Sequence, residues 1–515
     1  MRGDARLTIV PGDQPLVLVA PHGGRRDGVR RPWSDGHLRV NDLHTAALTA
    51  ELAARTGGAA VINAEHDRND VDLNRISDAH AAAPWFLEAL ATALETVLGR
   101  HQRATLLAVH GWNVVQPVVD LGLGCAPGDN PFTPAPGAAV GVAFAGAVLP
   151  RLVAACRARR IGATVGARYP ARHRENLLQL FGPRYANDPR PLVRALAAFA
   201  PRVDAVQLEL GIALRWPGSW RSRLVDTCLE VLPALLDPGS MSAMAPAAAG
   251  SAEAPVTARR LQFTDARLCG LVALDGGRGG RLLLFPPEGG LFLFTGERIG
   301  LEPDGVAGRL RLDPDVDGAL SVRFSGPLLR FPDTTPFLDL EAGLARAELL
   351  DADVAIRFVA DHPEEEFGTV TGSVTVGGET HRIRGDGFAT EEGPTGPWPR
   401  LRAALRLADG RGLVLTVGAD GEPPTGFVCR GGHRVAVASA RAVTGGSDSP
   451  LERVAFELAL SDGERLAIVT EAIHRLPVIR ARGGAAMRFE FAACRIGPGP
   501  GASRVPAGWL EAGGL

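Results

Sequence analysis

The sequence predicts an α/β fold with a mainly parallel sheet flanked by helices, followed by an all-β sandwich or barrel. Residues 1–235 alternate short apolar segments with longer stretches of helical character. Residues 257–515 instead contain short strand-like segments separated by Gly, Asp and Pro. Residues 236–256 have no apolar period and are rich in Ala, Pro, Gly and Ser, which is typical of a linker. A chain of 515 residues has room for two or three domains of ~100–200 residues each.

The first region repeats a strand-then-helix pattern along its length. Parallel strands need a crossover connection, usually a helix, so this alternation favours a parallel sheet with helices on both faces. The predicted strands are 16–21, 59–64, 105–110, 161–167 and 205–210, and the predicted helices are 42–56, near 80–100, near 140–159, near 190–199 and near 219–235.

The second region has the pattern of an antiparallel β protein. Its apolar runs are short, and turn residues separate them at close intervals. The clearest predicted strands are 281–287, 290–296, 319–326, 352–360, 368–378 and 412–418.

Composition excludes several classes of function. The 55 basic residues nearly cancel the 57 acidic ones, giving a formal charge of −2, and no basic stripe interleaved with aromatic residues is present, so we expect no nucleic-acid partner. The sequence contains no lysine. This excludes lysine Schiff-base chemistry, including pyridoxal-phosphate chemistry, and the Walker A phosphate loop.

Six cysteines are scattered through the chain with no CxxC pair, so we expect reduced thiols rather than a disulfide scaffold or a thiolate zinc site. The N-terminal segment is polar, and no stretch approaches the ~18–20 uninterrupted apolar residues of a membrane span. We therefore expect a cytoplasmic protein with no membrane partner. The sequence does not indicate an oligomeric state.

Two histidines stand where predicted strands end. His22 follows LVLVAP, His110 follows TLLAV, and glycine comes directly after each of them. Ligands bind beyond the carboxyl ends of parallel strands, and neutral imidazole is a common zinc ligand. The pair therefore predicts a Zn²⁺ site at this edge of the sheet.

A catalytic zinc site needs a third protein ligand and an open position for water. Asp42, at the start of the 42–56 helix, is the first candidate, although an N-cap is the alternative interpretation. Asp27, five residues after His22, is the second candidate, and His44 is a weaker third.

Other polar residues complete a candidate hydrolytic site. Glu209 lies in the apolar strand AVQLEL, where burial without a partner is costly, and a carboxylate near a zinc-bound water can act as a general base. Arg68 is placed to help polarise a carbonyl or to hold a second anionic group. Asn74 and Arg75 can present an amide and a guanidinium to a substrate carboxylate. The alternative for the 64–75 segment is a solvated surface loop.

Five segments, PHGG, DLHT, DRNDVDLNR, VHGWN and QLEL in that order, together resemble the N-formylglutamate amidohydrolase family, within the wider zinc carboxypeptidase-like fold. The resemblance covers roughly residues 5–235. It implies a zinc-dependent amidohydrolase acting on an N-acyl amino acid or a small γ-glutamyl or peptide amide. The partner it implies is thus a small-molecule amide that bears a carboxylate.

The resemblance also implies roles for individual residues. The family's R-x3-DxNR motif matches Arg68, Asp72, Asn74 and Arg75, and the corresponding Asn and Arg hold the substrate carboxylate in zinc carboxypeptidases. The later histidine strand fits His110, and the general-base glutamate fits Glu209. These two assignments agree with the roles argued from the residues alone.

The chain departs from the pattern at the third ligand. Carboxypeptidases carry an acidic ligand three residues after the first histidine, where this chain has Arg25. The related poly-γ-glutamate hydrolases have a Glu five residues after the histidine, a spacing that Asp27 matches, and then a Thr-led helix. Asp42, three residues before Thr45, matches the placement at the helix start. The choice between the two aspartates stays open.

In the second region, residues 381–400 resemble the lipocalin-like hydroxyneurosporene synthase and carotenoid hydratase group. Glu391, Glu392 and Trp398 would then line a pocket for an apolar or acyl-bearing ligand, and an ordinary loop is the alternative. Two competing functions follow: a non-catalytic ligand-binding protein, or a carotenoid or lipid hydratase-like activity of the β region.

Overall fold

The computed structural model divides into two compact units, one made almost wholly of residues up to Glu253 and the other of residues from Ala254 onward. Most of the predicted linker, residues 236–256, lies outside the described residues. The structure describes residues 7–24, 39–126, 128, 130–237, 258–274, 279–297, 310–315, 317–335, 337, 340–363, 365–390, 401–418, 423–445, 449, 451–482, 485–497 and 507–513.

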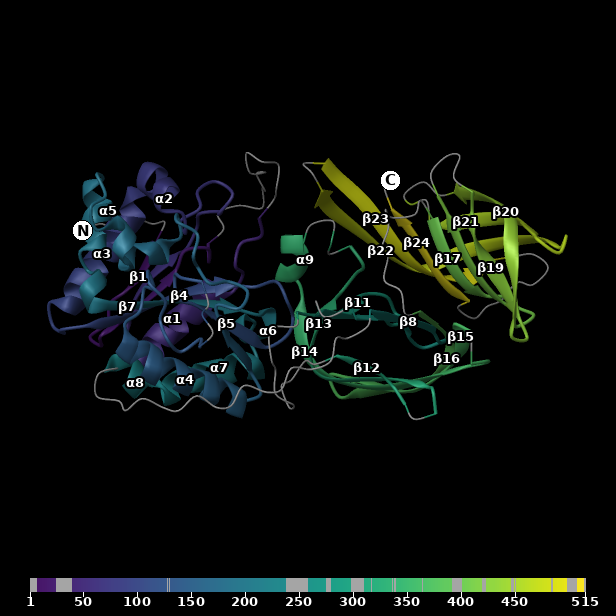
Figure 1. The fold of residues 1–515 in the computed structure, drawn as a ribbon, viewed down its shortest axis with the longest axis horizontal. Helices are drawn as coiled ribbons and strands as arrows, with labels where there is room; N and C mark the ends of the chain where they lie inside the picture. Colours follow the sequence, from purple (N-terminus) through teal and green to yellow (C-terminus); the bar gives the residue numbers. More distant parts are fainter. Residues whose placement is uncertain are drawn as a thin grey trace. The chain divides into compact units, whose positions relative to one another are not determined.

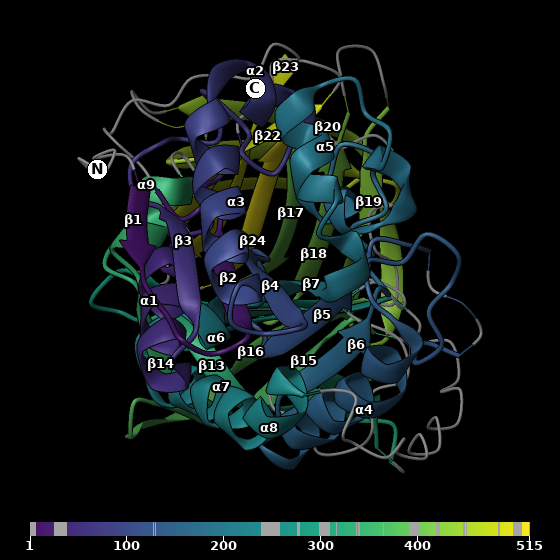
Figure 2. The same ribbon diagram turned by 90° about the vertical axis from the view of Figure 1, so that its left-hand side faces the viewer.

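The first unit, at the left of Figure 1, is built on a seven-stranded sheet with the order β1-β3-β2-β4-β7-β5-β6, whose strands are labelled in Figure 2. Four of its six pairings are parallel, and the pairings β1–β3 and β5–β7 are antiparallel. The sheet is therefore mixed, which refines the prediction of a mainly parallel one. Its strands are β1 (Leu7–Val10), β2 (Leu16–Ala20), β3 (Ala59–Asn63), β4 (Ala104–Gly111), β5 (Val118–Gly122), β6 (Gly162–Val165) and β7 (Val203–Leu210).

Helices cover both faces of this sheet. Helices α2, α3 and α5 lie on one face, and α1, α4, α7 and α8 lie on the other (Figures 1 and 2). The helices are α1 (Thr45–Thr56), α2 (Ile76–Ala82), α3 (Pro84–Leu98), α4 (Val142–Ala158), α5 (Pro191–Ala197), α6 (Ile212–Arg215), α7 (Ser219–Glu230) and α8 (Leu232–Leu236). Three short 3-10 helices are η1 (Leu177–Phe181), η2 (Pro183–Tyr185) and η3 (Ala200–Arg202).

Apolar periodicity explains how the helices attach. In α3, Phe86, Leu87, Leu90 and Leu94 are fully buried, and they recur at the spacing of one helix face. This face packs on β2, β3 and β4. Within the described residues, no single helix is long and apolar enough to cross a membrane; α2 and α3 reach that length only together, and they are bent by 107°.

Three element boundaries differ from the predictions. The helix predicted from residue 42 begins at Thr45, so Asp42 precedes it. The single helix predicted near 80–100 is two helices, because Pro84 starts a new helix after Ala83. The helix predicted near 219–235 is interrupted at Val231, and Pro233 stands in the first turn of the next helix.

The second unit contains two antiparallel barrels. A nine-stranded sheet, in the order β11-β10-β9-β8-β16-β15-β14-β13-β12, closes on itself because β11 also pairs with β13. Eight of these strands form the ring, and β12 is attached to β13. The strands are β8 (Arg259–Thr264), β9 (Cys269–Leu274), β10 (Gly279–Phe285), β11 (Leu291–Glu297), β12 (Arg311–Pro314), β13 (Leu320–Phe331), β14 (Glu348–Ala360), β15 (Phe367–Val376) and β16 (Glu379–Thr390), with the short helix α9 (Leu340–Ala345).

A second closed barrel runs in sequence order from β17 to β24, with β17 pairing to β24. Its apolar core includes Leu405, Leu413, Val454 and Leu510. The alternative of a barrel is thus the one observed for the all-β region. The strands are β17 (Leu401–Arg406), β18 (Gly412–Val417), β19 (Thr425–Arg430), β20 (His433–Gly445), β21 (Arg453–Leu460), β22 (Arg465–Arg482), β23 (Ala485–Ile496) and β24 (Gly508–Gly513).

Candidate metal centre

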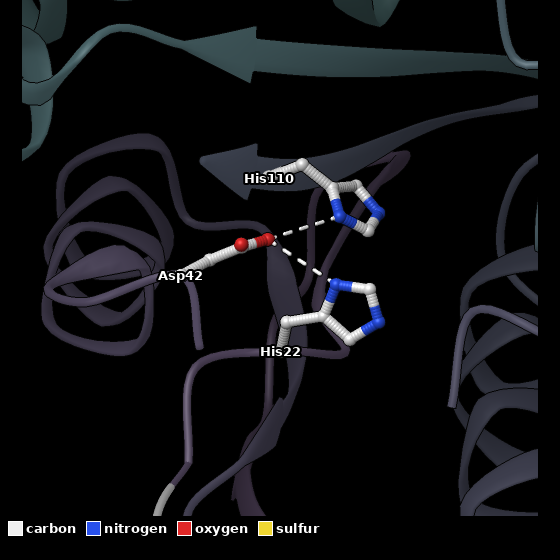
Figure 3. Close-up of side chains that lie close together, drawn as sticks. All are labelled: His22, Asp42 and His110. Carbon is white, nitrogen blue, oxygen red and sulfur yellow. Dashed lines mark hydrogen bonds and ion pairs between the residues drawn. The ribbon is translucent and has the colours of Figure 1, made fainter. Parts of the chain in front are cut away.

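Three buried side chains of the first unit meet beyond the central strands of its sheet. The Nδ1 atoms of His22 and His110 each lie 3.2 Å from Oδ2 of Asp42 (Figure 3). The exposed fractions of His22, Asp42 and His110 are 2%, 4% and 2%. One ligand atom from each residue lies within 4.8 Å of the others, so the three residues have the arrangement of a metal site.

The PHGG segment places His22 by close backbone packing. The residue lies in the turn after β2. A Cβ atom on Gly23 would lie 2.8 Å from the Cβ of Ala46 in α1, and a Cβ on Gly24 would lie 2.4 Å from the backbone nitrogen of Glu65. The two glycines are therefore required because the turn passes directly against its neighbours.

The backbone before α1 places Asp42 beside His22. The Asp42 N–H donates to the carbonyl of His22 at 3.0 Å, and the Asp42 carbonyl accepts from the Thr45 hydroxyl at 2.6 Å. His44, the weaker candidate, takes the left-handed conformation at φ 67°, and its ring lies 4.4 Å from that of Trp216. Burial lowers the pKa of His44 to about 4. The metal-site group contains Asp42 and not His44.

Asp72 fixes the orientation of the His22 ring. Oδ1 of Asp72 lies 2.7 Å from Nε2 of His22 and also accepts from the Asn74 N–H at 3.0 Å. The other oxygen of Asp72 accepts from Nη1 of Arg39 at 3.3 Å and lies 3.8 Å from Nε of Arg75. An ionised carboxylate only accepts hydrogen bonds, so Nε2 of His22 carries a proton, and Nδ1 is the ring atom that faces Asp42.

The donor set fits a metal ion. Nδ1 of His22 lies 3.2 Å from Oδ2 of Asp42, and a nitrogen lone pair and a carboxylate oxygen at that distance repel each other unless a proton or a metal ion lies between them. Tetrahedral zinc, with bonds of about 2.0–2.2 Å to nitrogen and oxygen, holds neighbouring ligand atoms about 3.3–3.5 Å apart. The observed 3.2 Å separations of both histidines from Asp42 are close to that value.

The charges around Asp42 keep it ionised. Burial acts to raise its pKa, but hydrogen bonds with His110 and His22 and the positive charge of Arg68 outweigh burial and hold the pKa well below its usual range. For His110, burial is the largest influence and lowers the pKa, which favours the neutral ring. For His22, burial also acts to lower the pKa, but the contacts with Asp72 and Asp42 outweigh it and raise the pKa, so zinc binding would displace a proton from this ring. An anionic carboxylate and a neutral imidazole are the forms that bind zinc.

Glu209 lies in β7 beside His110 of β4, with which it is paired in register. It is 9% exposed, and its Oε1 accepts from Nε2 of Gln207 at 2.8 Å. Oε1 of Gln207 in turn accepts from Nδ2 of Asn176 at 2.9 Å. This chain of amides fixes one oxygen of the Glu209 carboxylate.

The environment of Glu209 favours its protonated form. Burial raises its pKa well above the usual value, and the negative charges of Asp42 and Asp120 act in the same direction against Arg68 and Arg215. A carboxyl group with a raised pKa both accepts and returns a proton near neutral pH, as general acid–base catalysis requires.

Arg68 belongs to the same group of side chains. Its Nη1 donates to Oδ1 of Asp42 at 3.2 Å and to the carbonyl of Val40 at 3.1 Å. Its Nε is buried and has no hydrogen-bond partner among the described residues. The guanidinium of Arg68 is therefore in direct contact with Asp42.

Asn74 and Arg75 lie on the loop that Asp72 anchors. Oδ1 of Asn74 accepts from the backbone N–H of Leu177 at 3.2 Å. Nη1 of Arg75 lies 2.7 Å from Nδ1 of His173, and the Arg75 side chain is 30% exposed. Asn74 and Arg75 both lie close to Asp72, which in turn contacts His22. Their contact with a substrate carboxylate stays a prediction.

No family model matches this chain, and no curated protein matches it in sequence. Among solved structures, an N-formylglutamate amidohydrolase from Ralstonia eutropha JMP134 is similar at 16% sequence identity, with a TM-score of 0.31. The match covers 45% of this chain and 97% of that chain.

Four sequence-predicted site residues lie outside the described part of the chain. Asp27, the alternative third ligand, is one of them. Glu391, Glu392 and Trp398, the candidate pocket residues of the β region, are the others.

Three residues that fix side chains of the site have no role predicted from the sequence. Asp72 matches a motif position, and only the folded chain shows that it binds His22. Gln207 stands two residues before Glu209 in one strand, a spacing that puts both side chains on the same face and could have indicated their contact. Asn176 lies far from both in sequence, and no local pattern marks it.

Proposed function

We propose that the first unit is a zinc-dependent hydrolase of the C–N amide bond in an N-acyl amino acid, such as an N-formyl amino acid, or in a small γ-glutamyl or peptide amide. The observation that carries the proposal is the convergence of two imidazole Nδ1 atoms on one buried carboxylate oxygen. This donor set would hold zinc through His22, Asp42 and His110, and leave a position for water.

Zinc bound there would act as a Lewis acid and lower the pKa of water toward about 7. Glu209 removes one proton from the water that adds to the amide carbon, and it delivers that proton to the nitrogen as the C–N bond breaks. A carboxylic acid and an amine result. The raised pKa of Glu209 and its single contact with Gln207, through Oε1, support this role.

Arg68 and the Asn74–Arg75 pair would bind the substrate. Arg68 donates to the developing oxyanion through the guanidinium that also contacts Asp42. Asn74 and Arg75 hold a substrate carboxylate, because an amide and a planar guanidinium supply several donors in a fixed arrangement. The preferred substrate is thus a small amide that carries a carboxylate.

The test measures the metal content of protein purified without chelator. It also measures the hydrolysis of N-formyl, N-acetyl and γ-glutamyl amino acids. We expect about one zinc per wild-type chain, none in His22→Ala or Asp42→Ala, and an unchanged amount in Asp27→Ala. If Asp27→Ala lost zinc and Asp42→Ala kept it, Asp27 would replace Asp42 as the proposed third ligand. Wild-type protein without zinc would overturn the hydrolase proposal in favour of the ligand-binding alternative.

A further inference from the structure

Arg215, the last residue of α6, is a buried cation whose hydrogen bonds go to uncharged oxygens. It is 1% exposed. Nε donates to the carbonyl of Leu210 at 3.1 Å, Nη1 to the carbonyl of Leu43 at 2.7 Å, and Nη2 to the carbonyl of Trp112 at 3.1 Å and to Oδ1 of Asn113 at 3.3 Å. Burying a charge without a bonded counter-ion is costly, so this guanidinium needs an explanation.

The three carbonyls belong to the three segments that carry the site. Leu43 follows Asp42 directly, Leu210 follows Glu209 directly, and Trp112 stands two residues after His110. These segments are far apart in sequence, and they come from the loop before α1, the end of β7 and the end of β4. One planar group therefore fixes the spacing of two candidate ligands and the candidate base.

The surrounding charges and packing agree with such a role. Burial is the largest influence on the pKa of Arg215 and lowers it to about 10, and the carboxylate of Asp42 acts to raise it. A Cβ atom on Gly111 would lie 2.6 Å from Cζ and Nη1 of Arg215. Glycine at position 111, next to His110, thus leaves the space that the guanidinium occupies.

We propose that Arg215 is the positioning residue of the metal centre: its guanidinium, bound to the carbonyls of Leu43, Trp112 and Leu210, holds Asp42, His110 and Glu209 at the spacing that binds the metal. The inference rests on the proposed function and deepens it. Arg215 does not touch the metal or the substrate. Its effect reaches them through the backbone of the residues that do.

Two substitutions remove this contact in different ways. Arg215→Lys keeps the positive charge, but a single ammonium cannot reproduce the planar fork that reaches several oxygens. Gly111→Ala leaves Arg215 in place and displaces its guanidinium, the flexible end of a long side chain, so the fold tolerates the change. If Arg215→Lys fails to fold, Gly111→Ala decides the question.

The chain supplies a matched control for each substitution. Arg202 also donates to three backbone carbonyls, those of Leu98, His101 and Gln102, which precede β4, whereas His110 lies near the other end of that strand. Arg202→Lys therefore controls for the general loss of an arginine bound to backbone. Apart from the nearby backbone of α4 itself, an added Cβ on Gly146 meets no atom of the described residues within 4 Å, so Gly146→Ala controls for the added methyl group.

The readouts are the zinc dissociation constant and the absorption spectrum of the Co²⁺-substituted protein, which reports ligand geometry. We expect Arg215→Lys and Gly111→Ala to weaken zinc binding by about 10- to 100-fold, as substitutions behind metal ligands commonly do, and to change the cobalt spectrum. The two controls should leave both readouts unchanged. Wild-type affinity and an unchanged spectrum in both test variants would overturn the role of Arg215 and leave the proposed function intact.

A wild-type protein that binds no zinc would overturn the proposed function, and the positioning role would then be judged in the metal-free chain. The imidazole ¹⁵N signals of His22 and His110 report their tautomers and contacts. A shift of these signals in Arg215→Lys but not in Arg202→Lys would support the positioning role. Unshifted signals in Arg215→Lys would overturn it.

Discussion

Glu209 and Asp42 are neighbouring buried carboxylates whose pKa values depart from the usual range in opposite directions. Burial and the negative charges nearby raise the pKa of Glu209. Burial acts in the same sense on Asp42, but the two histidines and Arg68 outweigh it and lower the pKa. One carboxylate is thereby suited to exchange a proton and the other to stay charged as a ligand.

Replacing Glu209 by Gln should separate these two roles. The amide keeps the size of the side chain and cannot take a proton from water, so hydrolysis should fall by about 10²–10⁴-fold. Zinc content should remain at the wild-type level, because Glu209 is not among the three proposed ligands. Metal analysis and initial rates on the same preparation check this, and hydrolysis at the wild-type rate would sink the mechanism.

His474 gives a prediction for the second unit, well removed in sequence from the metal centre. Its ring stacks on Phe285 at 5.7 Å, and burial lowers its pKa against the opposing charge of Glu288. The unfolded chain therefore binds the proton more readily than the folded one. The contribution of His474 to the free energy of unfolding should be complete above the pKa of the unfolded chain, about 6.5. It should be lost as the pH falls from that value through the lower pKa of the folded protein.

The variant His474→Gln should remove this part of the pH dependence. Urea unfolding at pH 7.5 and at pH 5 measures it: the loss of unfolding free energy between the two should be smaller in the variant than in wild type. Equal losses in the two proteins would show that His474 does not contribute.

At the scale of elements, the turn after β2 depends on its two glycines. A Cβ on Gly24 meets backbone atoms of Ala64 and Glu65 at 2.6 and 2.4 Å, and backbone cannot move aside as a flexible side chain can. Gly24→Ala should therefore destabilise the first unit by about 1–3 kcal/mol, the usual cost of overpacking, and weaken zinc binding through His22.

The matched substitution Gly146→Ala lies inside α4, where the added methyl group meets no described residue outside the nearby helix backbone within 4 Å. It should stabilise the protein by about 0.5–1 kcal/mol, because alanine favours a helix over glycine. Denaturant unfolding of both variants checks the pair. A Gly24→Ala protein as stable as wild type would contradict the close packing of the turn.

The elements show which parts of the fold local pattern predicts. Apolar runs such as 16–20 and 203–210 are strands in the structure because their side chains are buried on both faces. Strand β5 was not predicted, and it contains Asp120 in an otherwise apolar stretch. That carboxylate accepts from Thr164 and from the backbone N–H groups of residues 167–169, partners more than 40 residues away that no local pattern reveals.

The site divides in the same way. Strand-end histidines and a glutamate in an apolar strand are visible in the sequence, because parallel strands bring their carboxyl ends to one edge. The choice of Asp42 over His44 depends on the left-handed turn at His44, which directs that ring to Trp216. The contacts of Asp72 and Arg215 depend on long-range packing and could not be read from spacing.

At the scale of the whole molecule, the division into two units predicts two separable unfolding transitions. Zinc binds only residues of the first unit in the proposed site, so it should raise the stability of that unit alone. At a free zinc concentration of about 100 times the dissociation constant, the gain is about 2.7 kcal/mol. Calorimetry of the full chain, with zinc and with chelator, checks this.

Adding zinc should raise the unfolding temperature of the first unit and leave that of the second unit unchanged. The variant Asp42→Ala should abolish the shift without affecting the second transition. Movement of both transitions by the same amount would show that the units unfold together, and movement of neither would contradict zinc binding to the folded chain.

The closed rings of the second unit bear on how this protein behaves when crowded. Strands paired on both sides offer no row of open backbone groups for another chain to extend, which is the first step toward cross-β stacking. Strand β12 lies at the end of its pairing order and has the sequence RLDP. Strand β12 contains one positive and one negative side chain and a proline, which lacks the N–H donor. This edge strand is therefore a poor template for fibrils.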